Sequence, residues 1–158
     1  MREFDELGLQ LAKSQARLFE SSLLNYKGSS AIFIRNYMYN TEVDRIDKYF
    51  EFNSTNIIND LNKRNLSIGK NKYTPEIMYW IGYIYRYWAY VYEISSKRIY
   101  KIVNAEKMNK LYKTYHTMDP KTAIDRILEE KGINNNNSYE EQYELYSKFV
   151  KEREFKYK

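Results

Sequence analysis

Cysteine is absent from this chain of 158 residues, and histidine occurs once, as His116. Without cysteine the chain can form no disulfide framework, no thiolate metal site and no cysteine nucleophile. A single histidine also excludes the metal sites that are built from several histidines. We therefore expect no metal site, and no motif in the sequence indicates a cofactor.

Proline and glycine are scarce, and long apolar runs are missing. Two prolines and five glycines are too few to punctuate a fold of many strands and turns. No apolar run approaches the roughly 20 residues that a membrane-spanning helix needs. The opening residues, MREFDELG, are too acidic for a signal peptide. We expect a soluble, helical, cytoplasmic protein that contacts no membrane.

The strongest local pattern is the segment KYTPEIMYWIGYIYRYWAYVYEI, which predicts a helix over 75–92. Thr74 suits the N-cap and Pro75 the first helical position. Apolar and aromatic side chains surround nearly the whole circumference, as in a helix that neighbours bury on several sides. Gly82 disfavours a helix, so we expect it to let another backbone approach closely. The sequence therefore predicts an all-α, single-domain bundle of six to eight helices around this central aromatic helix.

Amphipathic periodicity and capping residues predict the surrounding helices. We expect them at 2–26, 30–40, 41–50, around 57–61, 95–103, 104–115, 119–132 and 138–156. The four asparagines at 134–137 indicate a linker. The expected organisation is a helical core domain over 1–133, the linker at 134–137, and a C-terminal helix and tail over 138–158.

Positive charge is concentrated in one segment. The net charge of the chain is +5, and residues 94–118 carry that whole excess, with six basic residues against Glu106. The six are Lys97, Arg98, Lys101, Lys107, Lys110 and Lys113. Such a patch favours an anionic partner, which could be nucleic acid, an acidic protein surface or a phosphate group. The alternative is a solvated face of two helices.

Arg86 interrupts the aromatic surface of the central helix. A guanidinium does not lose its proton, so at a buried position it needs a carboxylate, a carbonyl or a ligand phosphate beside it. Arg86 with Tyr83, Tyr87 and Tyr90 is therefore a candidate site for a partner or ligand. The alternative is an internal salt bridge or an arginine stacked on tyrosines.

Arrangements of residues that support catalysis are nearly absent from the sequence. It has no glycine-rich phosphate loop, no nucleophile elbow and no acidic-x-x-His metal motif. His116 lies just before a predicted helix cap, where we expect it to bond a backbone group rather than to act as a general base. We therefore name no catalytic residue and expect a protein that is not an enzyme.

The segment ISSKRIYKIV at 94–103 resembles the start of a helix-turn-helix recognition helix. Ala89 occupies the position where the first helix of that motif has a small residue. Glu93 occupies the position where its turn prefers glycine, which is a departure from the pattern. The basic residues fall in this region, as binding in a DNA groove requires.

Three runs within residues 73–132 are distinctive: YTPEIMYWIGYIYRYW, YEISSKRIYKIV and YHTMDPKTAIDRILEEKG. Together with the N-terminal MREFDELGLQLAKSQARLFE, they resemble an antitoxin-like family of small proteins from low-GC Gram-positive bacteria. Proteins of that family are encoded beside ADP-ribosyltransferase-like proteins, an arrangement similar to a toxin–antitoxin pair. The resemblance implies a partner protein, the cognate toxin.

Three hypotheses for the function follow from these observations. The first is a non-catalytic, antitoxin-like protein that binds and neutralises a cognate toxin, because Tyr, Trp and Arg supply most anchors of protein interfaces. The alternative is a regulator that binds promoter DNA through residues 94–113. A second alternative is an enzyme or binder acting on a nucleotide or ADP-ribosyl group, with Arg86 and the tyrosines forming its pocket.

Overall fold

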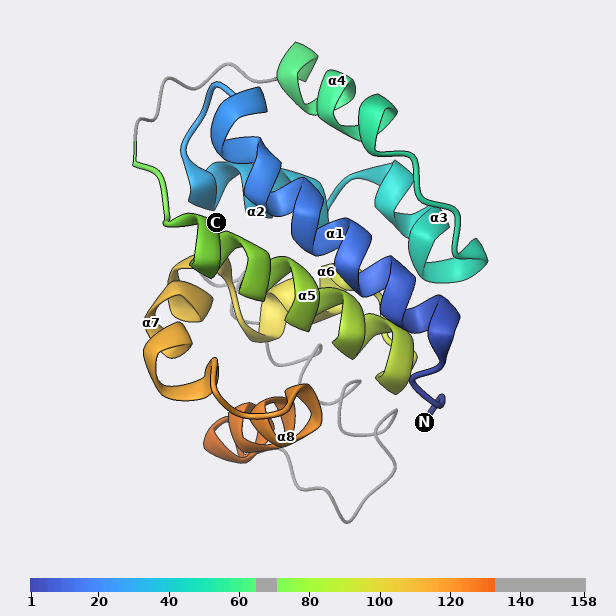
Figure 1. Ribbon diagram of the computed structural model, residues 1–158, viewed down its shortest axis with the longest axis vertical. Coiled ribbons are helices and arrows are strands. Elements are labelled where there is room, and N and C mark those ends of the chain that lie inside the picture. Colours follow the sequence, from blue (N-terminus) through green and yellow to red (C-terminus); the bar gives the residue numbers. More distant parts are fainter. Residues whose placement is uncertain (65–70, 133–158) are drawn as a thin grey trace, which may run out of the picture.

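Eight helices make up the part of the chain that the computed structural model describes, residues 1–64 and 71–132 (Figure 1). They are α1 (Glu6–Asn25), α2 (Ser30–Met38), α3 (Thr41–Tyr49), α4 (Ser54–Arg64), α5 (Pro75–Tyr92), α6 (Ser96–Ile102), α7 (Ala105–Tyr115) and α8 (Pro120–Glu130). No strand occurs in these two ranges. The predicted all-α fold and the number of helices are confirmed. The predicted linker at 134–137 and the helix after it lie outside the described residues.

Helix α5 is the centre of the bundle, as its aromatic pattern predicts. From Met78 to Tyr92 almost every side chain is buried, on all faces of the helix. Helix α1 lies alongside it over most of its length (Figure 1). A Cβ atom at Gly82 would lie 2.9 Å from Cα of Ala16 and 2.9 Å from the carbonyl oxygen of Gln15. The glycine therefore permits the close approach of two backbones that the sequence indicates.

The other helices surround this pair. Helices α2 and α4 pack against α1, whereas α6, α7 and α8 pack against α5. In Figure 1, α3 and α4 lie beyond α1, while α7 and α8 lie on the opposite side of α5. The short helix α6 lies behind α5 and also contacts α2 and α3. Helix α5 thus has neighbours on several sides, which explains its apolar circumference.

Side-chain caps define most of the helix starts. The residues Asp5, Ser29, Asn40, Thr74, Ser95, Asn104 and Asp119 each accept a hydrogen bond from a backbone N–H in the first turn that follows. The cap at Asp5 corrects one boundary, because the expected start of the first helix at residue 2 is wrong. The residues before Asp5 instead lie against the C-terminal end of α5, where the Arg2 N–H donates to the carbonyl of Val91 at 2.7 Å.

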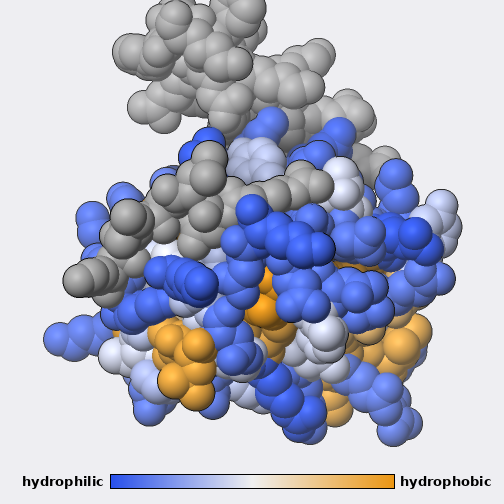
Figure 2. Space-filling view, turned by 90° about the horizontal axis from the view of Figure 1, so that it is seen from above, coloured by the Kyte–Doolittle hydropathy of each residue, from blue (hydrophilic) through white to orange (hydrophobic). Residues whose placement is uncertain are grey.

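The surface of the described residues is mainly polar. The exposed large hydrophobic residues are Met1, Leu7, Leu24 and Tyr49. Figure 2 shows one face of the molecule, on which hydrophobic side chains form separate patches between hydrophilic ones. Isolated apolar side chains of this kind are normal on a protein surface. None of the helices in the two described ranges combines the length and the apolar character needed to cross a bilayer.

Candidate functional site

Arg86 is buried at the junction of four helices. Its exposed fraction is 1%, and its Nη1 donates to the Asp47 carboxylate of α3 at 2.6 Å. Nε donates to Oε1 of Gln15 in α1 at 3.0 Å, and Nη2 donates to the hydroxyl of Ser96 in α6 at 3.3 Å. The guanidinium therefore has a partner on each nitrogen. This is the internal salt bridge that the sequence leaves open as the alternative to a ligand site.

The partners of Arg86 make further hydrogen bonds of their own. The Asp47 carboxylate also accepts hydrogen bonds from the backbone N–H of Ser96 at 2.8 Å and from its hydroxyl at 2.7 Å. Gln15 donates to the carbonyl of Gly82 at 2.8 Å and accepts from the Tyr37 hydroxyl at 2.7 Å. Burial raises the pKa of Tyr37 well above its usual range, so this hydroxyl stays a donor at neutral pH. The network ties α1, α2, α3, α5 and α6 together.

The tyrosines that the sequence groups with Arg86 hold the N-terminal segment instead. The ring of Phe4 lies 4.5 Å from that of Tyr87 and 6.3 Å from that of Tyr83. The Tyr90 hydroxyl donates to Asp5 at 2.6 Å. Arg86 and these tyrosines therefore have different partners. The reason is that Gln15, Asp47 and Ser96 already fill the space around the guanidinium.

The basic segment keeps most of its charge at the surface. Arg98, Lys107, Lys110 and Lys113 are exposed, while Lys97 and Lys101 are half-buried. Nζ of Lys97 lies 3.8 Å from the Asp44 carboxylate. Such a long, partly exposed pair contributes little to stability. Ile99 and Ile102 of the same helix are buried.

One observation supports the helix-turn-helix resemblance at 94–103, and another opposes it. Glu93 has φ 56° and ψ 49°, the left-handed conformation for which the motif uses glycine. However, α6 has seven residues, and its first residue, Ser96, is buried against Asp47. In helix-turn-helix proteins the N-terminal residues of the recognition helix contact the bases. Here that end of the helix is covered by α3.

A cleft of about 400 Å³ between α5 and α7 is the feature that the sequence does not reveal as a site. Its lining comprises Glu76, Tyr79, Trp80, Tyr83, Ile84, Tyr112, His116, Met118 and Pro120. Tyr83 belongs to the predicted site, whereas the other lining residues do not. The spacing of four residues between Tyr79 and Tyr83, and between Tyr112 and His116, places each pair on one helix face. That spacing is how the two aromatic walls can be recognised in the sequence.

The rings of this aromatic cleft pack in two stacked pairs. Tyr79 and Tyr83 of α5 lie 6.5 Å apart, and Tyr112 and His116 lie 4.3 Å apart with an interplanar angle of 17°. Nδ1 of His116 lies 2.8 Å from the Tyr112 carbonyl oxygen, which confirms the expected backbone bond. The Trp80 ring meets that of Tyr112 edge to face at 5.7 Å. The indole nitrogen of Trp80 is buried and has no acceptor.

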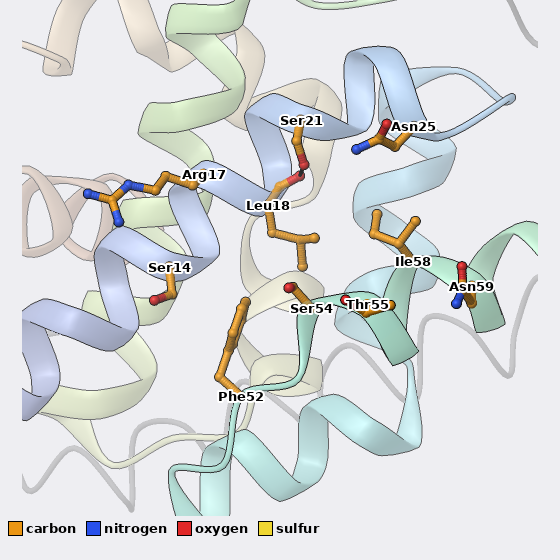
Figure 3. Close-up of a pocket in the computed structure, with 10 residues that line it drawn as sticks. All are labelled: Ser14, Arg17, Leu18, Ser21, Asn25, Phe52, Ser54, Thr55, Ile58 and Asn59. Carbon is orange, nitrogen blue, oxygen red and sulfur yellow. Dashed lines mark hydrogen bonds between the residues drawn. The ribbon is translucent and has the colours of Figure 1, made fainter.

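A second groove, of about 500 Å³, lies between α1 and α4 (Figure 3). Leu18, Phe52 and Ile58 form its apolar part, and hydroxyls such as those of Ser14 and Ser54 form its rim. The Arg17 side chain extends away from the other lining residues in Figure 3. Arg86 lines neither this groove nor the aromatic cleft. Among the described residues no cluster of His, Asp and Glu could hold a metal ion.

Comparisons of the chain with protein-family models, with curated proteins and with solved structures find no match. The sites above therefore carry the functional argument by their own geometry.

Proposed function

We propose that this chain is a non-catalytic, antitoxin-like protein that binds and neutralises a cognate toxin, with an ADP-ribosyltransferase-like protein as the expected partner. The observation that supports the proposal is the presence of two recognition features on α5, α6 and α7. One is the aromatic cleft, and the other is the set of exposed and half-buried cations at 97–113. Aromatic rings and charged groups of one sign are typical of protein interfaces that need both anchors and orientation.

The internal network around Arg86 supports a binding role in a second way. It joins α6 to α3 through Asp47 and joins α5 to α1 through Gln15. Helix α6, which carries Lys97, Arg98 and Lys101, and helix α5, which supplies one wall of the cleft, are thereby held in place before any partner arrives. A preorganised surface loses less conformational entropy on association, so more of the contact energy appears as affinity. Such a protein acts in the cytoplasm, beside the toxin that it covers.

Co-expression with the protein encoded beside it tests the proposal. We expect that protein alone to arrest growth, and we expect growth to return when this chain is produced with it. A tagged chain should also retain the partner through purification at 0.15 M salt. Failure to relieve the arrest, together with failure to retain the partner, would contradict the proposal.

Binding to promoter DNA is the second candidate, because Glu93 adopts the glycine-like conformation of a helix-turn-helix turn. The burial of Ser96 weighs against insertion of α6 into a groove. An autoregulatory antitoxin would combine both activities. The test is a gel shift of its own promoter fragment between 50 and 200 mM salt, because phosphate contacts make affinity fall steeply with salt. An affinity that does not exceed that for unrelated DNA excludes this candidate.

A further inference from the structure

Trp80, which lines the aromatic cleft, carries a polar atom that the fold leaves without a partner. The indole N–H of Trp80 is buried, the side chain is 8% exposed, and no acceptor lies within reach. Buried donors are nearly always hydrogen-bonded in native proteins, so an orphaned one needs an explanation. Other buried donors nearby do have acceptors, for example the Tyr85 hydroxyl on the Val103 carbonyl. One residue of the cleft lining thus carries an unused donor, which is itself buried.

The charge of the lining is the second observation. Glu76 is its acidic residue, and no lysine or arginine occurs among the described residues that line the cleft. Lys107 and Lys110 of α7 belong to other faces of the helix than Tyr112 and His116, since successive residues differ by about 100°, and Lys113, one turn before His116, is not among the lining residues. The cleft therefore combines a carboxylate with the faces and edges of five rings.

We propose that this cleft receives an arginine side chain of the partner protein, an inference that rests on the proposed function. A guanidinium is planar and weakly hydrated, stacks on aromatic faces and pairs with a carboxylate through two N–H groups. The tyrosine and histidine rings supply the faces, and Glu76 supplies the carboxylate. A main-chain carbonyl beside that arginine is the acceptor for the Trp80 N–H, once small side-chain shifts open the way to it.

The same observations disfavour the other occupants of an aromatic cleft. Sites that stack nucleobases combine rings with basic side chains that follow the phosphates, whereas this lining carries a carboxylate. A purely apolar side chain would make no use of the Glu76 carboxylate. Lysine carries the right charge, but its compact ammonium is strongly hydrated and has no planar surface to stack.

A peptide titration tests the inference without any toxin. The probe is the tripeptide Gly-Arg-Gly with blocked ends, and the control is the same peptide with citrulline, which has nearly the shape of arginine but no charge. The full chain labelled with ¹⁵N gives indole signals for Trp80 and Trp88, which Trp80→Phe assigns. We expect the Trp80 signal to shift in a saturable way while the Trp88 signal stays in place. The citrulline peptide should bind at least tenfold more weakly than the arginine peptide.

Two variants sharpen this titration. Glu76→Gln should lower the affinity for the arginine peptide at least fivefold. Glu106→Gln, which changes an exposed carboxylate outside the cleft, should leave that affinity unchanged. The inference is overturned if the Trp80 signal does not shift, or if citrulline binds as well as arginine. It is also overturned if adenosine monophosphate shifts the same signal at lower concentration, because the cleft is then a nucleotide site.

The complex with the co-encoded protein separates this inference from the proposed function. Glu76→Lys places a cation where the partner's arginine should enter, so we expect the affinity to fall at least tenfold. If the complex forms and Glu76→Lys binds as the parent does, the cleft is not used and the proposed function stands. If the co-encoded protein does not bind at all, the proposed function fails, and the peptide titration still decides what the cleft accepts.

Discussion

The carboxylate of Asp47 accepts a hydrogen bond from Nη1 of Arg86 at 2.6 Å, and both side chains are almost completely removed from water. The second carboxylate oxygen accepts the backbone N–H of Ser96 at the start of α6. One pair of residues therefore fixes the position of α3, α5 and α6 together. A buried pair of this kind specifies how helices meet, although its net contribution to stability is small.

Breaking that pair from one side should be more harmful than removing it entirely. We expect Asp47→Ala to lower the free energy of unfolding by about 3–5 kcal/mol, because it leaves the Arg86 charge buried without a carboxylate. The double variant Asp47→Leu with Arg86→Met should lose less than the single variant. Urea unfolding followed by circular dichroism measures both. A double variant less stable than Asp47→Ala would contradict this account of the pair.

Acid should weaken the fold through two capping aspartates. The Tyr90 hydroxyl and the Gly8 N–H lower the pKa of Asp5, and the hydroxyl and N–H of Thr122 lower the pKa of Asp119. The pKa of each carboxyl is lower in the folded chain than its value of 3.8 in the unfolded chain. The ionised carboxylates therefore stabilise the fold fully above pH 3.8, and this stabilisation is lost as the pH falls through the pKa of the folded state.

The double variant Asp5→Asn with Asp119→Asn keeps both caps but cannot titrate. We expect it to be less stable than the parent at pH 7, and we expect the difference to shrink as the pH falls toward 2, as measured by urea midpoints across that range. Glu129→Gln, at an exposed carboxyl, is the control and should not change the pH profile. A difference between parent and double variant that persists unchanged at pH 2 would show that the two caps do not act through their charge.

Gly82→Ala should destabilise the protein even though alanine favours helices by about 1 kcal/mol over glycine. The added methyl group would lie 2.9 Å from the backbone of α1, which is too close for the helices to keep their positions. Overpacking of this kind costs about 1–3 kcal/mol. Thr114→Ala, on the exposed surface of α7, is the matched control and should be neutral or slightly stabilising. Thermal unfolding compares the two, and a stabilised Gly82→Ala variant would mean that α1 and α5 do not meet here.

Trp80→Phe should be tolerated better than Tyr85→Phe. The first change removes a buried donor that has no acceptor, whereas the second removes the donor to the Val103 carbonyl and leaves that carbonyl unpaired. An acceptor orphaned in the interior costs about 1–3 kcal/mol, so we expect the larger loss for Tyr85→Phe. Denaturant midpoints give the comparison. Equal or reversed losses would contradict this ranking.

Much of the fold can be read in the sequence because its signals are local. Caps such as Thr74 and Asp119 act within one turn of their own helix, and the apolar circumference of α5 needs no knowledge of its neighbours. The candidate site is different. Asp47 becomes the partner of Arg86 through the placement of α3, 39 residues away in the chain, and no local pattern indicates that pairing. The aromatic cleft likewise forms only where α7 meets the first half of α5.

The most direct test of the proposed function is the affinity of the purified chain for the co-encoded protein, measured by calorimetry. The variant Lys97→Glu, Arg98→Glu, Lys101→Glu is compared with the control reversal Lys13→Glu, Arg17→Glu, Lys27→Glu, which changes exposed cations on and just after α1. Each surface substitution should shift stability by about 0.5 kcal/mol or less, so both proteins should fold. We predict tight binding by the parent and the control, and at least a tenfold loss for the reversal at 97–101. Equal affinity of all three proteins, or no binding by the parent, would contradict the account.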